Sequence, residues 1–209
     1  MIFAHRGFVA NNSPENSVSA LKNAYQHNFE GVEFDLWFIN HQFVIKHDQP
    51  SQEQIQNLPK LRDFWQFGNQ LYYWLDFKNL NESNYVAAIS QLRQEMILAN
   101  INVEQIYFVP YITNYKLARK VLLEAKRLIG ENLKIAAIYD DAKNYQQLVE
   151  FVKNKAIKYL SIDYSLIDRK LLKDLVNVNL MAWTIKNQST FEDLQKIGVK
   201  NFASDICFN

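Results

Sequence analysis

The sequence predicts an α/β protein, a compact (β/α)8 TIM barrel with a short hairpin after its second strand. Eight short apolar runs alternate with longer amphipathic segments along the 209 residues. Each run and the segment after it make a βα unit, and repeated βα units require a parallel sheet. An open doubly wound sheet is the competing architecture. Unbroken alternation over eight strands favours closure, although such barrels usually have about 250 residues.

The strands are predicted from short apolar runs bounded by polar or turn-forming residues. A hairpin from Trp37 to Lys46 follows the second of them, with its turn at His41-Gln42. The predicted strands lie at Ile2–Ala4, Val32–Leu36, Leu71–Asp76, Gln105–Phe108, Lys134–Ile138, Tyr159–Ile162, Leu180–Trp183 and Asn201–Ala203.

The segments between the strands predict helices because their apolar residues recur at helical spacing. No linker, composition shift or charge block marks a boundary, so we expect one domain over residues 1–209. The predicted helices lie at Ser17–His27, Tyr85–Ala99, Lys116–Leu128, Tyr145–Asn154, Leu171–Val176 and Thr190–Ile197, with a weaker one near Leu61–Phe67.

Composition excludes several classes of protein. A hydrophobic content of 48% and an aromatic content of 14% provide for a large core and exclude general disorder. The net charge of +1 gives no electrostatic basis for a nucleic-acid partner or an anionic membrane surface. One cysteine, Cys207, cannot form an internal disulfide and is expected to be a small buried residue.

The chain shows no sign of membrane insertion or export. No apolar run approaches the roughly 18 residues that a transmembrane helix needs. The first residues lack the charged, apolar and small-residue succession of a signal peptide. We therefore expect no integral membrane segment and a cytoplasmic location.

Candidate functional residues cluster where the first three strands end, which is the face that carries chemistry in a barrel. These strands supply every strong candidate that the sequence offers. In chain order the candidates are His5 and Arg6, Glu33 and Asp35, His47 after the hairpin, and Asp76 and Lys78.

The three carboxylates predict a metal site. Glu33 and Asp35 are two residues apart on a strand and project to the same face, with Asp76 on a neighbouring strand. Carboxylates crowded inside a barrel repel each other and lose hydration. A divalent cation, Mg²⁺ or Ca²⁺, is the simplest compensation because both prefer oxygen ligands.

The remaining candidates indicate phosphate-ester cleavage. Arg6 and Lys78 are placed to hold an anionic substrate against the metal, and their alternative role is to neutralise the carboxylates as structural ion pairs. His5 and His47 are able to transfer protons near neutral pH. Metal, cations and two histidines together describe a site for cleaving a phosphate ester.

Seven short motifs, in order from the first strand to the last, carry a family resemblance. They are Ala4-His5-Arg6-Gly7, Pro14-Glu15-Asn16-Ser17, Gly31-Val32-Glu33-Phe34-Asp35, His47-Asp48, Leu75-Asp76-Phe77-Lys78, Ala182-Trp183-Thr184-Ile185 and the run from Gly198 to Asp205. In these motifs the chain resembles the glycerophosphodiester phosphodiesterase family.

The resemblance implies a TIM barrel that uses a divalent metal to hydrolyse glycerophosphodiesters, which are small molecules, to glycerol 3-phosphate and an alcohol. It implies an acid–base pair, a cyclic phosphate intermediate, phosphate contacts and a pocket-lining tryptophan. By position these roles fall on His5 and His47 as acid and base, on Glu33, Asp35 and Asp76 as metal ligands, on Arg6 and Lys78 at the phosphate, and on Trp183 in the substrate pocket.

Two departures from the family pattern bear on the substrate. Asp76 stands where the family commonly has Glu, and the Asp-x-Lys arrangement also resembles sphingomyelinase D-type phospholipases. Only Gln49–Gln70 lies where many members carry an inserted region, so a more open mouth is expected. The alternatives are a lysophospholipase D or sphingomyelinase D-like phosphodiesterase, and a non-catalytic barrel that binds phosphorylated ligands.

Overall fold

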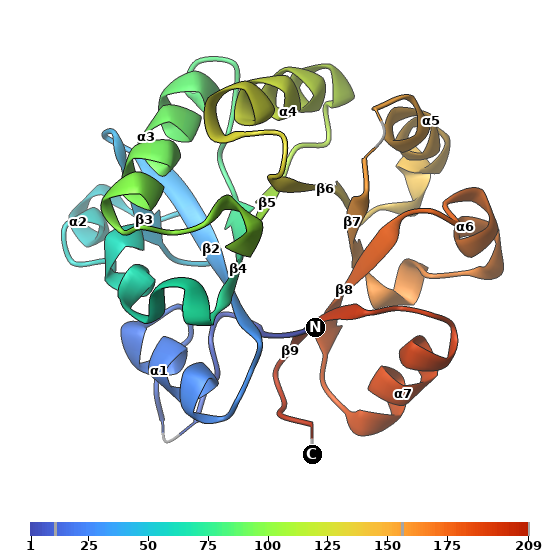
Figure 1. The fold of residues 1–209 in the computed structure, drawn as a ribbon, viewed down its shortest axis with the longest axis horizontal. Helices are drawn as coiled ribbons and strands as arrows, with labels where there is room; N and C mark the ends of the chain where they lie inside the picture. The colour runs from blue at the N-terminus through green and yellow to red at the C-terminus, as the bar shows by residue number, and fades with distance from the viewer. Residues whose placement is uncertain (11, 156, 209) are drawn as a thin grey trace.

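A computed structural model describes residues 1–10, 12–155 and 157–208. Eight parallel strands close into a barrel, because β1 pairs with both β9 and β2 (Figure 1). The predicted (β/α)8 TIM barrel is confirmed. Its strands are β1 (Ile2–Ala4), β2 (Gly31–Ile39), β4 (Tyr72–Phe77), β5 (Ile106–Pro110), β6 (Lys134–Tyr139), β7 (Tyr159–Asp163), β8 (Asn179–Ile185) and β9 (Asn201–Ser204).

The predicted hairpin is present as β2 and the antiparallel β3 (Gln42–Ile45). Its turn, however, lies one residue earlier than predicted. Gln42 pairs with Ile39, so the loop consists of Asn40 and His41. Both have positive φ, 50° and 59°, as a tight two-residue hairpin requires, and Asn tolerates that region better than most residues.

Helices surround the barrel at each predicted place (Figure 1). Two local differences have clear causes. Helix α6 begins at Arg169 because Asp168 caps it, accepting a hydrogen bond from the backbone N–H of Leu171. The four-residue α2 was not predicted and is too short to show a period. The α-helices are α1 (Val18–Gln26), α2 (Gln52–Ile55), α3 (Tyr85–Leu98), α4 (Tyr115–Ile129), α5 (Tyr145–Lys155), α6 (Arg169–Asp174) and α7 (Gln188–Lys196).

Short 3₁₀ helices complete the connections. The segment between β3 and β4 carries the 3₁₀ helix η1 (Leu61–Gln70) after α2, where a weak helix was predicted. The others are η2 (Val103–Gln105), η3 (Ala142–Asn144) and η4 (Tyr164–Leu166).

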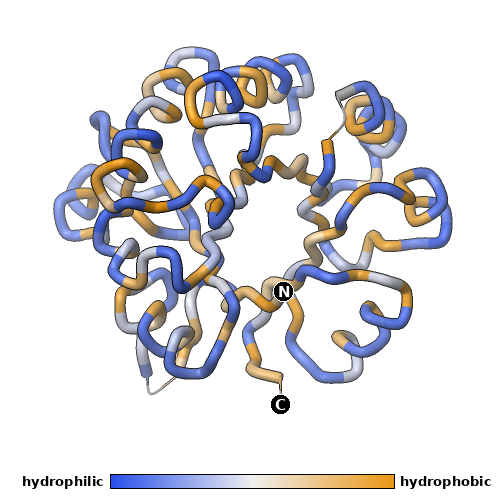
Figure 2. The backbone as a smooth tube through the Cα atoms, in the orientation of Figure 1, coloured by the Kyte–Doolittle hydropathy of each residue, from blue (hydrophilic) through white to orange (hydrophobic). Residues whose placement is uncertain are grey.

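Hydrophobic residues form two separate layers of core. The larger lies between the sheet and the outer helices, each of which carries both hydrophobic and hydrophilic residues (Figure 2). The smaller cluster fills the barrel and includes Phe3, Trp74 and Tyr107. Gly31 is needed beside it, because a Cβ there would lie 2.6 Å from the ring of Phe3. This apolar filling occupies the interior below the polar ends of the strands.

Two remaining sequence predictions concern the chain's surface and its environment. Cys207 is exposed, so the prediction of a buried cysteine was wrong. It follows the last strand, outside the helix and sheet layers that bury apolar groups. None of the helices that the structure describes is long and apolar enough to cross a membrane.

Candidate active site

A cavity of about 240 Å³ lies at the carboxyl ends of the barrel strands. All eight residues predicted from the sequence line it. The complete lining is His5, Arg6, Glu33, Asp35, His47, Trp74, Asp76, Lys78, Tyr111, Ile138, Asp140, Ser161, Trp183, Thr184 and Ala203.

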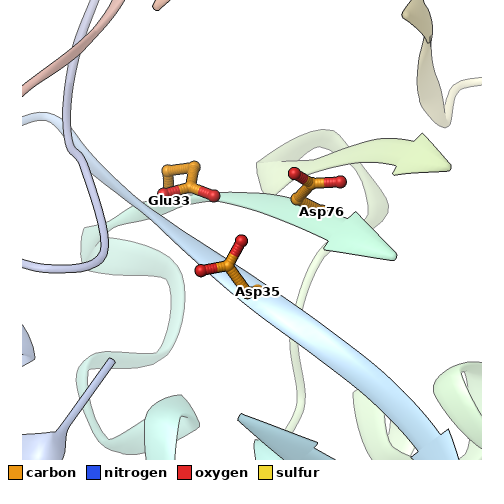
Figure 3. Close-up of side chains that lie close together, drawn as sticks. All are labelled: Glu33, Asp35 and Asp76. Carbon is orange, nitrogen blue, oxygen red and sulfur yellow. The ribbon is translucent and has the colours of Figure 1, made fainter. Parts of the chain in front are cut away.

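The three predicted carboxylates converge on one point of the cavity wall (Figure 3). Glu33 and Asp35 project from β2, and Asp76 projects from β4, where it is paired in register with Asp35. One oxygen of each lies within 4.8 Å of the others. Glu33 and Asp35 are almost fully buried, at 4% and 2% exposure.

The turn after β1 is built to meet this cluster. Arg6 and Gly7 both have positive φ, 53° and 76°. This conformation directs the backbone N–H of Arg6 to Glu33 Oε2, at 2.8 Å. A Cβ on Gly7 would lie 2.7 Å from the Cβ of Ala20 on α1, so only glycine fits. Backbone bonds from Arg6 and Gly7 thus hold the turn against β2, and the backbone N–H of His5 bonds to Ser204 on β9.

Asp35 is the best-compensated carboxylate of the three. Lys78 Nζ lies 2.8 Å from its Oδ1, and the side chain of Asn16 donates to its Oδ2 at 2.7 Å. Burial by itself raises the pKa of Asp35. The charge of Lys78 and these hydrogen bonds outweigh burial and hold the pKa below its usual range.

The pKa values of Glu33 and Asp76 are raised, whereas that of Asp35 is lowered. Burial, reinforced by the charge of Asp35, raises the pKa of Glu33 to about 8. Burial also raises the pKa of Asp76, although Lys78 Nζ lies 2.6 Å from its Oδ2. The other oxygen, Asp76 Oδ1, is buried and has no hydrogen-bond partner. A buried oxygen without a partner, beside two more carboxylates, fits a hard divalent cation such as Mg²⁺ or Ca²⁺.

Arg6 and Lys78 both form ion pairs at the cavity. Arg6 Nη1 lies 3.0 Å from Glu15 Oε2, and its Nε lies 3.5 Å from Asp35 Oδ2. Lys78 bridges Asp35 and Asp76, and these carboxylates keep its pKa raised although burial opposes this. The alternative role of neutralising carboxylates is therefore present in the structure, and contact with a substrate phosphate stays a prediction.

The two predicted histidines occupy different environments. His5 lies mostly inside the barrel mouth, and its Nδ1 is 2.7 Å from Asp205 Oδ1. Burial alone lowers the pKa of His5, but the bond to Asp205 and the charge of Glu33 outweigh it and raise the pKa. His47 is 41% exposed, with its Nδ1 2.9 Å from the Oδ1 of the exposed Asp48.

The interpretation that the first three strands supply every strong candidate was incomplete. Later strands contribute Tyr111, Asp140, Ser161 and Thr184 to the same cavity, and Asp205 reaches His5 from the end of β9. Closure of the barrel brings all strand ends together, so every polar residue just after a predicted strand was a candidate. That rule would have found Asp140, which directly follows β6.

Trp183 lines the cavity from β8, where the sequence predicted a pocket residue. Its indole N–H donates to Ser161 Oγ on the neighbouring β7 at 2.9 Å. This bond fixes the ring at the mouth, opposite the carboxylate cluster that β2 and β4 carry.

Solved structures match this chain over nearly its whole length. A glycerophosphodiester phosphodiesterase from Parabacteroides distasonis matches with a TM-score of 0.79 and 17% identity, over 99% of this chain and 92% of that one. An Oleispira antarctica phosphodiesterase in complex with its product, sn-glycerol-3-phosphate, matches with a TM-score of 0.75 and 19% identity, over 99% and 93%. This chain has the fold of these phosphodiesterases.

A third solved structure also matches nearly the whole chain at low sequence identity. The Silicibacter pomeroyi structure, described as a glycerophosphoryl diester phosphodiesterase, gives a TM-score of 0.77 at 12% identity, over 99% of this chain and 90% of that one. No protein-family profile and no curated protein sequence matches the chain. The resemblance read from the motifs is thus confirmed by structural comparison, at the level of the fold.

Proposed function

We propose that this protein is a phosphoric diester hydrolase that cleaves glycerophosphodiesters to glycerol 3-phosphate and an alcohol. One observation carries the proposal: two histidines, two cations and the cluster of Glu33, Asp35 and Asp76 line a single cavity at the carboxyl end of a TIM barrel. The fold of known phosphodiesterases supports it, as does the glycerol 3-phosphate that the Oleispira antarctica enzyme holds as product.

Glu33, Asp35 and Asp76 would hold a divalent metal, Mg²⁺ or Ca²⁺. Their oxygens lie close together, and Asp76 Oδ1 has no other partner. When bound, such an ion neutralises negative charge on the phosphate oxygens as the transition state forms. It would also oppose the effect of burial and of the Asp35 charge, which together raise the pKa of Glu33 to about 8.

Arg6 and Lys78 would bind the non-bridging oxygens of the phosphate. Both cations line the cavity beside the carboxylates, and each is already oriented by an ion pair. Groups held in place before the reaction need no reorganisation as charge develops.

His5 and His47 would act as the acid–base pair. The pKa of Asp205 is below its usual range because, although burial raises it, the hydrogen bond and charge of His5 outweigh burial. An ionised carboxylate only accepts hydrogen bonds, so His5 Nδ1 carries the proton and Nε2 is the basic nitrogen of the neutral ring. Thr184 Oγ1 lies 3.4 Å from that Nε2, which is therefore a hydrogen-bonding position within the cavity.

The attacking oxygen would come from the substrate. The hydroxyl of Ser204 donates to backbone carbonyls, and that of Ser161 accepts from Trp183, so both serines of the strand ends have structural partners. A histidine would take the proton of the glycerol hydroxyl next to the phosphate, and that oxygen would form a bond to phosphorus. The bond to the departing alcohol would break, and the other histidine would protonate its oxygen. Proximity favours this route because the neighbouring hydroxyl is already in place.

The first stage would yield glycerol 1,2-cyclic phosphate and the free alcohol. A water molecule would then open the ring, with its proton going to a histidine and the ring oxygen receiving one. We place this activity in a single cytoplasmic domain over residues 1–209.

A panel of diesters tests the proposed function. Glycerophosphocholine and lysophosphatidylcholine are incubated with the protein, with Mg²⁺, with Ca²⁺ or with excess chelator, and released glycerol 3-phosphate and choline are measured. We expect metal-dependent release of glycerol 3-phosphate from glycerophosphocholine. Cleavage of lysophosphatidylcholine alone would assign the chain to the lysophospholipase D alternative. Ligand binding without turnover under any metal would indicate a non-catalytic barrel.

A further inference from the structure

The cavity has two chemically different sides. The strands β1, β2 and β4 supply the carboxylate cluster with Arg6 and Lys78, the side to which we assign the phosphate. The opposite side comes from β5 to β8 and contributes one carboxylate among aromatic, aliphatic and hydroxyl groups. We call it the β5–β8 side, and its residues are Tyr111, Ile138, Asp140, Ser161, Trp183 and Thr184.

Asp140 is the carboxylate of the β5–β8 side. It is half-buried, and it accepts a hydrogen bond from the hydroxyl of Tyr111. Among the residues that the structure describes, no lysine, arginine or histidine forms an ion pair with it. It therefore brings a negative charge to the cavity that no cationic side chain neutralises.

Two acidic residues near Asp140 in the chain differ from it because their side chains accept hydrogen bonds from backbone N–H groups. Asp141 accepts from the N–H of Lys143 at the start of η3, and Asp163 accepts from Ser165 at the start of η4. Neither lines the cavity. Asp140 is thus the acidic residue of the β5–β8 side that lines the cavity and caps no backbone N–H group in the described part of the chain.

Tyr111 separates the two sides and orients Asp140. Its backbone N–H donates to the carbonyl of Phe77 at 2.9 Å, which fixes it beside β4. Lys78 Nζ lies 5.8 Å from the centre of its ring, so one side of the tyrosine faces the phosphate-binding cation. Its hydroxyl reaches Asp140 on the other side. The tyrosine therefore lies between the positive charge of Lys78 and the negative charge of Asp140.

We propose that Asp140, oriented by Tyr111, binds the positively charged nitrogen of an amino alcohol in the substrate. The preferred substrates are then zwitterionic glycerophosphodiesters, such as those of choline or ethanolamine, rather than diesters of uncharged alcohols. This inference rests on the proposed function, and it names the substrate class of that same site.

Charge complementarity is the physical basis for this choice. A zwitterionic diester carries its phosphate and its nitrogen at opposite ends, and the cavity carries Lys78 and Asp140 on either side of Tyr111. A carboxylate that is half-buried and unpaired gains more from a cation than from a neutral hydroxyl. The indole of Trp183, held by its bond to Ser161, lines the same cavity, and aromatic rings attract cations.

The test compares glycerophosphocholine with glycerophosphoglycerol, which lacks the charge. We measure kcat/KM for both with wild type, Asp140→Asn and Tyr111→Phe. Wild type should favour glycerophosphocholine, and Asp140→Asn should lower the ratio of the two kcat/KM values about tenfold, mainly through KM. Tyr111→Phe should lower the ratio less, because the carboxylate stays and loses only its orientation. Asp141→Asn is the matched control: it removes the neighbouring charge outside the cavity and should leave the ratio as in wild type.

Two results would overturn the inference. One is an unchanged ratio in Asp140→Asn, including the case in which both substrates weaken equally, which would place uncharged glycerol at Asp140. The other is a fall in the ratio for Asp141→Asn that equals the fall for Asp140→Asn, which would show a general effect of negative charge. If wild type cleaves neither diester, the proposed function fails. The ratio of dissociation constants for the same two diesters, measured on the same variants, then decides the inference by the same criteria.

Discussion

Asp205 and His5 are 200 residues apart in the chain, yet Asp205 Oδ1 lies 2.7 Å from His5 Nδ1. Parallel pairing of β9 with β1 brings them together. The carboxylate selects the tautomer in which Nδ1 carries the proton, and it raises the pKa of His5 against the effect of burial. Asp205 is accordingly a positioning residue for the proposed acid–base chemistry.

Asp205→Asn should lower kcat and shift the pH dependence. An amide has nearly the shape of the carboxylate but not its charge, so the pKa of His5 should fall and its tautomer should be less restricted. We expect a loss of about tenfold to a hundredfold in kcat, as for groups that orient catalytic side chains. The pH–rate profile and an NMR titration of His5 measure both effects. Asp193→Asn, on the exposed face of α7, is the control. If the pKa of His5 in Asp205→Asn were the same as in wild type, this role would be excluded.

Replacing either cavity histidine by alanine should reduce turnover without unfolding the protein. General acid–base groups contribute about 10²–10⁴-fold each, so His5→Ala and His47→Ala should each lose that much in kcat. His41→Asn at the hairpin turn serves as control, because Asn accepts the positive φ found there. Circular dichroism checks the fold. Turnover near that of wild type in one alanine variant would remove that histidine from the mechanism.

Metal binding should depend on a carboxylate at position 76. Asp76 Oδ1 has no protein partner, so Asp76→Ala should remove a ligand, whereas Asp76→Glu keeps one. Calorimetric titration with Mg²⁺ and Ca²⁺ should therefore rank affinities as wild type, then Glu, then Ala. Asp35→Asn should also weaken binding. Equal affinity in wild type and Asp76→Ala would place the ion elsewhere.

The metal-free protein should lose stability as the pH rises through the range in which Glu33 titrates. The folded-state pKa of Glu33 is about 8, above its ordinary value of 4.5, because it is buried beside Asp35. Between those values the folded state binds more protons than the unfolded state, so the free energy of unfolding falls with rising pH. One such group accounts for at most about 1.4 kcal/mol per pH unit.

Urea denaturation in excess chelator at pH 6, 7 and 8 measures this slope. Glu33→Gln supplies a neutral side chain of the same size and should flatten it. The slope would be attributed to other groups if the Gln variant kept the full dependence.

The substrate hydroxyl next to the phosphate should be essential for turnover. A diester in which hydrogen replaces that hydroxyl should bind but resist hydrolysis, since the proposed ring cannot form. Thr184→Val tests the competing protein hydroxyl, because Thr184 Oγ1 lies 3.4 Å from His5 Nε2. We expect this variant to keep most of its activity on the normal substrate. Rapid cleavage of the deoxy analogue would show that water attacks phosphorus directly.

Much of the fold follows from local pattern. Apolar runs alternating with amphipathic segments predict a parallel sheet, and unbroken alternation over eight strands favours its closure into a barrel. The misplaced hairpin turn shows where pattern reading stops: Asn40 and His41 both take positive φ, which the pairing of Ile39 with Gln42 imposes. Helix α2, with four residues, carries too little period to be detected.

The inward direction of Glu33, Asp35 and Asp76 is a local property as well, because alternate residues of a strand share a face. Which groups they meet is decided by closure of the barrel, which joins Asp205 to His5 and brings Asp140 into the same cavity as Lys78. The raised pKa of Glu33 and the lowered pKa of Asp35 arise there too. Both shifts depend on burial and on distances between charges from separate strands, and these exist only once the chain has folded.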